Sequence, residues 1–336
     1  MIINMAHGSG GSDTSKLIEE VFKGAFSNEY LNRMEDSSIV PGADRLSVTT
    51  DSFVVQPVIY DGGDIGRLSV CGTVNDLLMS GAEPKYLTAG FVLEEGLDVD
   101  LLKRIVRSMA DTAEEAGVRI VTGDTKVVEA PKDAERKPGL IINTAGIGFL
   151  KDGVSPGTDK IKPGDSVILS GNLGDHHLSI MKERLNIKND LIKSDTAPLN
   201  EMVRALFDAG VRVHAMRDVT RGGLGTVLNE FVHGSGCEIL IREAALPVSD
   251  SVRDFCGLLG LDIVYLGNEG KMVCAVDPKD GDKALEIIRN SKYGENAAVI
   301  GEVQEHKADP RLIMETPIGG LRSVSPLFGE GLPRIC

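Results

Sequence analysis

The sequence lacks the features of a secreted or membrane-bound protein. None of its apolar runs approaches the length that a transmembrane helix needs. The first residues, MIINMAHGSGG, contain no basic segment followed by an apolar stretch, so they do not form a signal peptide. The five cysteines are odd in number and have no C-x-x-C spacing, which argues against a disulfide framework and a zinc site. We therefore expect a cytoplasmic protein.

Positive charge is also scarce. The net charge is −14 and the isoelectric point is near 5.0. Such a surface repels phosphate backbones and anionic lipid heads, so neither nucleic acid nor a membrane is an expected partner. Most of this charge serves solubility, and carboxylates that hold metal ions can supply a few of the negative charges.

Two common nucleotide-binding motifs are absent, because no stretch matches a Walker A loop or G-x-G-x-x-G. Two glycine-rich stretches nevertheless open predicted helices: HGSGG at residues 7–11, and RGGLG at residues 221–225. Free N–H groups at a helix N-terminus favour phosphate oxygens. A flexible N-terminus and a tight turn are the plainer interpretations. His176 and His177 are adjacent, so they point in different directions and are interpreted as ordinary surface or packing residues.

The 336 residues suit two domains of ordinary size, and both halves mix helices and strands. In the first half, the patterns predict strands over 46–55, 86–93, 118–128 and 140–150, and helices over 12–26, 65–79 and 101–116. In the second half, they predict strands over 165–169, 213–219, 238–242, 272–276 and 298–303, and helices over 175–184, 198–209, 223–232, 251–259 and 282–289. The fold class is therefore α+β.

Turn-rich segments divide the chain. One such segment covers residues 151–164 and reads KDGVSPGTDKIKPG. It predicts a boundary between an N-terminal domain of residues 1–152 and a C-terminal domain of residues 153–316. The charged stretch 129–138 predicts an exposed loop. From residue 317 onward, prolines and glycines predict a flexible arm that ends in Cys336.

Acidic residues stand just beyond apolar runs, beside glycines or small polar residues. They are Asp51, Asp76, Asp124, Asp218 and Glu269. Strand ends gather on one side of a sheet, so these carboxylates can converge, and their hard oxygens suit the Mg²⁺ that accompanies ATP phosphates. Each aspartate taken alone is more typical of a turn or a helix cap, and it is the set of five acidic residues in similar contexts that makes a site a competitive interpretation.

Cys336 differs from the other cysteines because no residue follows it. The absence of three further residues excludes a prenylation signal. A terminal thiol on a flexible arm can act as a nucleophile or a carrier once it is deprotonated, although it can also be incidental.

Seven segments, in order, resemble the HypE family of hydrogenase maturation factors, the carbamoyl dehydratases. They are HGSGG, VNDLLMSGAEP, TGDTKVV, INTAGIG, RDVTRGGL, NEG and the terminal PRIC. The middle segments are shared with a wider ATP-using superfamily that includes aminoimidazole ribonucleotide synthetase, thiamine monophosphate kinase and selenophosphate synthetase. PRIC distinguishes the dehydratases within it.

The resemblance implies a homodimer in which the N-terminal domains pair to form a β-barrel-like core, with ATP bound between domains and near that interface. It implies that a carbamoyltransferase, HypF, loads the terminal thiol, that the carbamoyl group is dehydrated to a thiocyanate, and that cyanide passes to iron on a HypC–HypD scaffold for a [NiFe] hydrogenase.

The resemblance also assigns roles to residues. The implied Mg²⁺ ligands are Asp51, Asp76, Asp124 and Asp218. The implied nucleotide contacts are Gly8, Gly10, Gly11, Thr220 and Gly222, together with the same four aspartates. The implied catalytic residues are Cys336, Glu269 as the base near the substrate nitrogen, and Lys126 as its assistant.

Two other functions stay open at this stage. An enzyme of the superfamily that acts on a free small molecule is one, and selenophosphate synthetase is the strongest example. That enzyme is expected to carry a reactive cysteine or selenocysteine near the N-terminus, whereas the first cysteine here is Cys71. The other is a carrier or scaffold without ATP chemistry, which leaves the acidic residues without a role.

Overall fold

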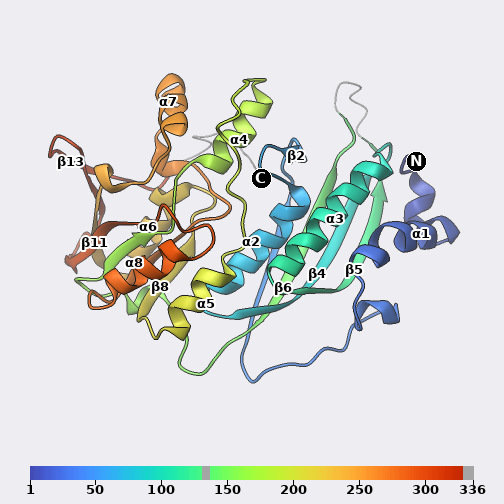
Figure 1. The fold of residues 1–336 in the computed structure, drawn as a ribbon, viewed down its shortest axis with the longest axis horizontal. Coiled ribbons are helices and arrows are strands. Elements are labelled where there is room, and N and C mark those ends of the chain that lie inside the picture. Colours follow the sequence, from blue (N-terminus) through green and yellow to red (C-terminus); the bar gives the residue numbers. More distant parts are fainter. Residues whose placement is uncertain (131–136, 328–336) are drawn as a thin grey trace.

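The first half of the chain forms a four-stranded sheet covered on one face by two helices (Figure 1). The computed structural model describes residues 1–130 and 137–327. The sheet order is β1-β6-β4-β5, with bounds β1 Leu46–Phe53, β6 Leu140–Phe149, β4 Glu83–Glu94 and β5 Arg119–Val128. The covering helices are α2 Ile65–Met79 and α3 Val99–Glu115, and a short hairpin, β2 Ile59–Tyr60 and β3 Gly63–Asp64, precedes α2.

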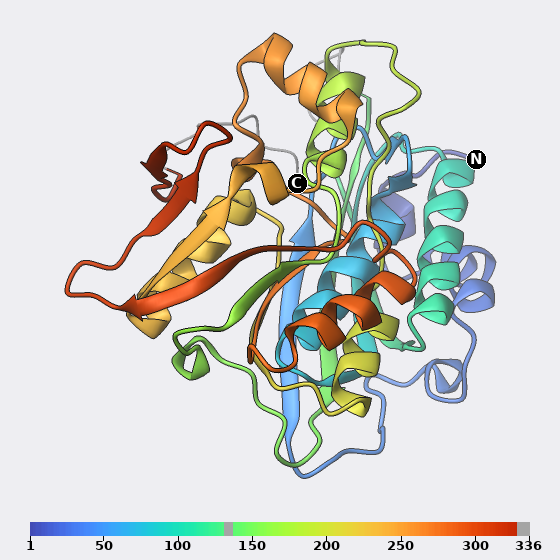
Figure 2. The same ribbon diagram turned by 60° about the vertical axis from the view of Figure 1, so that its left-hand side comes forward.

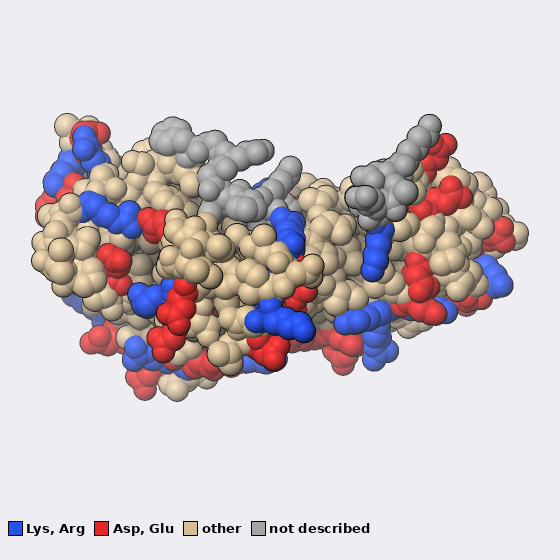
Figure 3. Space-filling model, turned by 90° about the horizontal axis from the view of Figure 1, so that it is seen from above, with Lys and Arg blue, Asp and Glu red and all other residues tan. Residues whose placement is uncertain are grey.

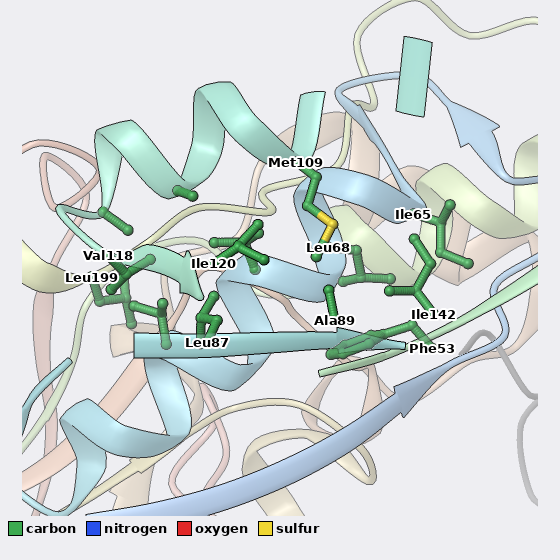
Figure 4. Close-up of a cluster of buried hydrophobic side chains, with 14 of the residues drawn as sticks. Phe53, Ile65, Leu68, Leu87, Ala89, Met109, Val118, Ile120, Ile142 and Leu199 are labelled. Carbon is green, nitrogen blue, oxygen red and sulfur yellow. The ribbon is translucent and has the colours of Figure 1, made fainter. Parts of the chain in front are cut away.

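The core of this half lies between the helices and the sheet. Met109 of α3 points toward Leu68 of α2 and Ala89 of β4, and Leu87 of β4 lies beside Ile120 of β5 (Figure 4). Helix α3 buries one stripe, as its periodicity predicts, whereas α2 is buried on nearly all sides. Helix α2 is enclosed because it also contacts the second half of the chain.

The opposite face of the sheet is open among the described residues. Val48 of β1 is 68% exposed and Ile141 of β6 is 40% exposed. The strand register places both on the face that carries Asp124 and Lys126 of β5, whereas Asp51 points to the helix side with the buried Thr144. Alternation along the strands therefore separates two groups of predicted site residues.

The second half is built on a seven-stranded sheet with order β13-β12-β9-β11-β7-β10-β8 (Figure 2). The strands are β7 Ser166–Leu169, β8 Val213–Asp218, β9 Cys237–Arg242, β10 Met272–Val276, β11 Ala298–His306, β12 Leu312–Glu315 and β13 Leu321–Ser323. The helices are α4 Asp175–Arg184, α5 Asn200–Asp208, α6 Gly223–Ser235, α7 Asp250–Leu259 and α8 Gly281–Asn290.

Side chains of α2 hold the two halves together. The Asn75 amide donates to the Ala197 carbonyl and accepts from the Leu199 N–H, both at 3.0 Å. The Arg67 Nε donates to the Thr196 carbonyl at 2.8 Å. These bonds fasten the segment before α5 against a helix of the first half.

The predicted elements are present, with three differences. The helix expected over 12–26 is α1, Ser12–Leu17, continued by a π-helical turn over Ile18–Lys23. Strands β2, β3, β12 and β13 were not predicted, because each has no more than four residues. The predicted loop 129–138 lies largely outside the described residues.

The prediction of a flexible arm from residue 317 onward is partly wrong. Strand β13 pairs with β12, Val324 is buried, and the Ser325 carbonyl accepts from the Tyr265 hydroxyl at 2.7 Å. The Asn229 amide also donates to the Val324 carbonyl at 2.9 Å. The chain is therefore fixed to the C-terminal domain at least as far as Ser325. Cys336 itself lies outside the described residues.

No helix in the described part of the chain is long and apolar enough to cross a bilayer.

The packing of α2 on α3 predicts opposite effects for two glycine substitutions. A Cβ at Gly66 would lie 2.3 Å from the Ile105 carbonyl oxygen of α3, whereas a Cβ at Gly257 in α7 meets nothing within 4 Å. We expect Gly66→Ala to lower the free energy of unfolding by about 1–3 kcal/mol. Gly257→Ala, the matched control, should raise it by up to about 1 kcal/mol. Urea unfolding followed by circular dichroism measures both, and equal stabilities would contradict the packing.

Candidate active site

An acidic cavity of about 140 Å³ lies where the two halves meet. Its carboxylates come from both halves: Asp51 of β1 and Asp76 of α2 from the first, Asp218 of β8 and Glu269 of the loop before β10 from the second. Thr220 and Arg221, at the turn that precedes α6, also line it, as do Thr50, Ser52, Phe53 and Gly72. Four of the five predicted acidic residues thus converge.

Local geometry explains how this cavity stays open. The Thr49 hydroxyl donates to Asp76 Oδ2 at 2.8 Å, which ties α2 to β1. Gly72 of α2 faces β1, and a Cβ there would lie 2.8 Å from the Phe53 ring and 3.9 Å from Asp51 Oδ2. A larger residue at this position would displace Phe53 and fill the space beside Asp51.

The carboxylates lie in a strongly negative field. Burial, and then the charge of Asp76, raises the pKa of Asp218 to about 7. Burial also raises the pKa of Asp76, with Asp51 adding to it. Glu269 is 6% exposed, and burial with the charge of Asp218 holds its pKa well above the usual range. Arg221 compensates weakly, because it is 73% exposed and its guanidinium lies 4.0 Å from Asp51.

The donor set of this cavity suits a hard divalent cation. Asp51, Asp76 and Asp218 supply carboxylate oxygens, and the bound positive charge would relieve their mutual repulsion. Within residues 1–130 and 137–327, no three His, Cys, Asp or Glu side chains are close enough to share one ion. The three aspartates therefore fit as ligands around a larger group, such as a metal with its phosphates, more than as a closed cage.

Asp124 and Lys126 do not join this cavity, so the expected convergence of all five carboxylates is wrong. They lie on the opposite face of the sheet, and strands β6 and β4 separate β5 from β1. Asp124 accepts from Lys126 Nζ at 2.9 Å. Strands β1 and β5 run in the same direction, because β1 and β4 are both antiparallel to β6 and β4 is parallel to β5. The two intervening strands and the alternation of side chains along β5 therefore keep Asp124 away from Asp51.

A second cavity, of about 260 Å³, lies beside these two residues. Gly8 and Gly10 line it together with Asp124 and Lys126, and Phe22, Phe26 and Phe91 make much of it apolar. Gly8 has no room for a side chain, because a Cβ would lie 2.8 Å from the Val127 nitrogen. This N-terminal cavity combines a close backbone approach, two lysines (Lys23 and Lys126) and an apolar floor, which suits a nucleotide.

The other predicted glycines lie at helix starts and line neither cavity. Gly11 is the N-cap of α1, a helix of six residues. Gly222 is the N-cap of α6 and has φ +76°, and a Cβ there would lie 2.3 Å from the Thr226 hydroxyl. Gly222 therefore permits the turn that brings Thr220 and Arg221 to the acidic cavity.

The adjacent histidines and the four described cysteines belong to the packed interior. His176 and His177 are both buried, and burial lowers the pKa of each to about 4. His176 Nδ1 lies 2.8 Å from the Ser194 hydroxyl. Cys71, Cys237, Cys256 and Cys274 are free and buried, as expected for packing thiols. Of the five cysteines, Cys336 lies outside the described residues.

Sequence reasoning missed Thr49, Arg221 and the ion pair of Asp195 with Lys271. Arg221 stands inside a glycine-rich segment that was noticed for its backbone alone. Asp195 follows no apolar strand, so the pattern that found the other carboxylates gave no signal for it.

Comparison with known proteins defines the class of this fold and site. The family model of the AIR synthase related protein N-terminal domain matches residues 34–150, and that of the C-terminal domain matches residues 162–311. The chain is therefore an AIR synthase related protein.

Full-length relatives narrow the family. The chain is 45% identical over 341 residues to the carbamoyl dehydratase HypE of Azotobacter vinelandii, covering 99% of this chain and 97% of that protein. The crystal structure of the hydrogenase maturation protein HypE in complex with ATP superposes with a TM-score of 0.93 at 43% identity, covering 99% of both chains. The crystal structure of a HypE-HypF complex gives a TM-score of 0.80 at 46% identity, covering 93% of this chain and 99% of that one. The chain belongs to the HypE family of carbamoyl dehydratases.

The raised pKa of Asp218 predicts how one substitution changes stability with pH. In the folded protein Asp218 titrates near 7, and in the unfolded chain near its ordinary value of 3.8. The native state therefore binds this proton more tightly, and the stability from the protonated form is lost as pH rises through 7. Asp218→Asn should raise the free energy of unfolding at pH 8 by on the order of 2 kcal/mol, and much less at pH 5.

Urea unfolding in chelator at both pH values tests this expectation. Asp254→Asn, on the exposed side of α7, is the control for the substitution itself. A stabilisation by Asp218→Asn that is the same at pH 5 and pH 8 would contradict the raised pKa.

Proposed function

We propose that the protein uses ATP to dehydrate an S-carbamoyl group on Cys336 to a thiocyanate. Its support is the convergence of Asp51, Asp76, Asp218 and Glu269 between the two halves, within a chain of the dehydratase family that ends in a cysteine.

The chemistry requires a leaving group and a base. An amide oxygen leaves poorly, and transfer of the ATP γ-phosphoryl group onto it makes it a good leaving group. Loss of phosphate and of both N–H protons then closes the C≡N bond, so thiocarboxamide and ATP give thiocyanate, ADP and phosphate. Glu269 is the proposed acceptor of an N–H proton, because it is a carboxylate at the wall of the acidic cavity.

Phosphoryl transfer fits the three aspartates of this cavity. Asp51, Asp76 and Asp218 are the proposed ligands of Mg²⁺, which, when bound, neutralises and aligns the phosphates. Thr220 and the Gly222 turn are proposed to contact the phosphates. The proposed metal ligands also place Glu269 in a negative field, so a cation bound there would lower the pKa of Glu269.

The acidic cavity lies at the β1 edge of the N-terminal sheet and the N-terminal cavity at its β5 edge, and a homodimer can bring such edges together. The open face carries Val48, Ile141, Asp124 and Lys126. We propose that a second copy covers this face, so that the sheets form the barrel-like core that the resemblance implies. Gly8, Gly10 and Gly11 with Asp124 would then hold nucleotide near that interface, and Lys126 would stabilise negative charge there.

The family places the reaction in a sequence of partners. A relative has been solved as a HypE-HypF complex. HypF is accordingly the proposed carbamoyl donor, and a HypC–HypD scaffold the proposed acceptor of cyanide for the iron of a [NiFe] hydrogenase. The four described cysteines are free, which suits the reducing cytoplasm where we place this chemistry.

The reaction is tested by intact mass. After loading by the carbamoyltransferase, the protein should gain one carbamoyl group on Cys336, and the adduct should lose one water only when MgATP is added. Cys336→Ser should accept no stable thiocarboxamide, while Cys237→Ser, which changes a buried thiol, should behave as the wild type. A wild-type adduct that keeps its water while ATP is hydrolysed would refute the dehydratase reaction and point to a free substrate.

Glu269→Gln should separate loading from dehydration. The variant keeps the shape of the side chain but cannot accept a proton, so we expect normal carbamoyl loading and ATP binding, with water loss about 10²–10⁴-fold slower. Glu295→Gln, an exposed glutamate that lines a different cavity, is the control. Rapid-quench mass measurement of a single turnover gives the rate, and an unchanged rate in Glu269→Gln would exclude it as the base.

A further inference from the structure

An ion pair buried near the acidic cavity holds the backbone of Glu269. Asp195 and Lys271 lie 3.2 Å apart, with side chains 4% and 9% exposed. Neither residue lines the acidic cavity. Both line a separate polar cavity of about 390 Å³, together with Arg67 and Tyr293. The mechanism proposed above gives this pair no role.

The contacts of Asp195 are directed at the Glu269 peptide. The Glu269 N–H donates to Asp195 Oδ1 at 3.0 Å, and the Ala197 N–H donates to the Glu269 carbonyl at 3.3 Å. Lys271 faces the other carboxylate oxygen and also donates to the Gly270 carbonyl at 3.0 Å. Both sides of the Glu269 residue are therefore fixed to the segment 195–197.

Close packing leaves this loop little freedom. A Cβ at Gly270 would lie 1.9 Å from the Asp195 carbonyl oxygen, so the two backbones touch. Asn268 adds a second attachment, because its amide donates to the Val219 carbonyl at 3.1 Å and accepts from the Gly174 N–H at 2.7 Å. The Glu269 carboxylate, in contrast, receives no hydrogen bond from the described residues. The contacts that hold Glu269 are therefore those of its backbone.

We propose that Asp195, held by Lys271, is a positioning residue that fixes the Glu269 peptide and so aims the Glu269 carboxylate into the acidic cavity. This inference rests on the proposed role of Glu269 as the base. The segment that carries Asp195 is itself fastened to α2 through Arg67 and Asn75. Asp195 thereby links the base of the second half to the aspartates of the first.

The test compares two variants of Asp195, one that loses the hydrogen-bond acceptor and one that loses only the negative charge. Asp195→Ala removes the acceptor, and we expect single-turnover dehydration of carbamoylated protein to slow about 100-fold, because a loose base loses its alignment. Asp195→Asn keeps Oδ1 as an acceptor and should stay within about fivefold of the wild-type rate. The ATP Kd should change less than about threefold in both, since neither side chain lines the acidic cavity. Glu295→Gln, in the same polar cavity, should match the wild type.

A double-mutant cycle with Glu269→Gln distinguishes positioning from a general structural effect. If Asp195 acts through Glu269, Asp195→Ala should slow a Glu269→Gln background less than about threefold. If Asp195→Ala does not fold, Asp195→Ser carries the same expectations, because its side chain is too short to reach the Glu269 N–H.

Several results would overturn the inference. An equal loss of dehydration rate in Asp195→Ala and Asp195→Asn would mean that the hydrogen-bond acceptor does not determine the rate. If the rate losses of the two single variants multiply in the double variant, Asp195 acts independently of Glu269. If Asp195→Ala has a normal rate while Glu269→Gln is slow, Asp195 is not a positioning residue, and Glu269 remains the proposed base. A normal rate in Glu269→Gln itself would refute the proposed base, which is a separate failure.

Discussion

The site depends on how α2 is seated between the two sheets. Its residues are buried on nearly all sides, and the Asn75 amide bonds the second half of the chain through both of its polar atoms. Buried amides that lose such partners destabilise a fold by about 1–3 kcal/mol each. The same helix carries Asp76 and Gly72, a position where a side chain would collide with the Phe53 ring. A shift of α2 would therefore separate the carboxylates of the two halves and change their common field.

The mutual repulsion of these carboxylates destabilises the folded protein and favours the binding of a cation. Four carboxylates share one small cavity, with the exposed Arg221 as their compensating charge among the described residues. The pKa values of Asp76, Asp218 and Glu269 are all raised, which is a cost to the empty protein. A cation and its phosphates would remove that cost. Figure 3 shows that acidic and basic side chains are interspersed on the outer face seen from above, so the concentration of one sign is a property of the cavity.

The sequence predicted the elements and most of the acidic site, and it failed where the outcome depends on register or on tertiary contact. Asp51, Asp76, Asp218 and Glu269 were found by one pattern, an acid after an apolar run, and they do converge. Asp124 has the same pattern, but it lies two strands away from β1, and the alternation along β5 directs it to the other face of the sheet. Asp195 could not be found because its role lies in a contact with a residue 74 positions away.

The attachment of the C-terminal segment to the protein bears on the reaction order of any step at the terminal thiol. Tyr265 and Asn229 hold the chain at Val324 and Ser325, and eleven residues follow. A group carried on the terminal thiol is covalently joined to its own protein, so its encounter with the site does not depend on the concentration of protein in solution. The chemical step is then first order and has no Michaelis constant for the cargo. Supply and removal of that cargo by other proteins, one group per chain per cycle, would limit the flux.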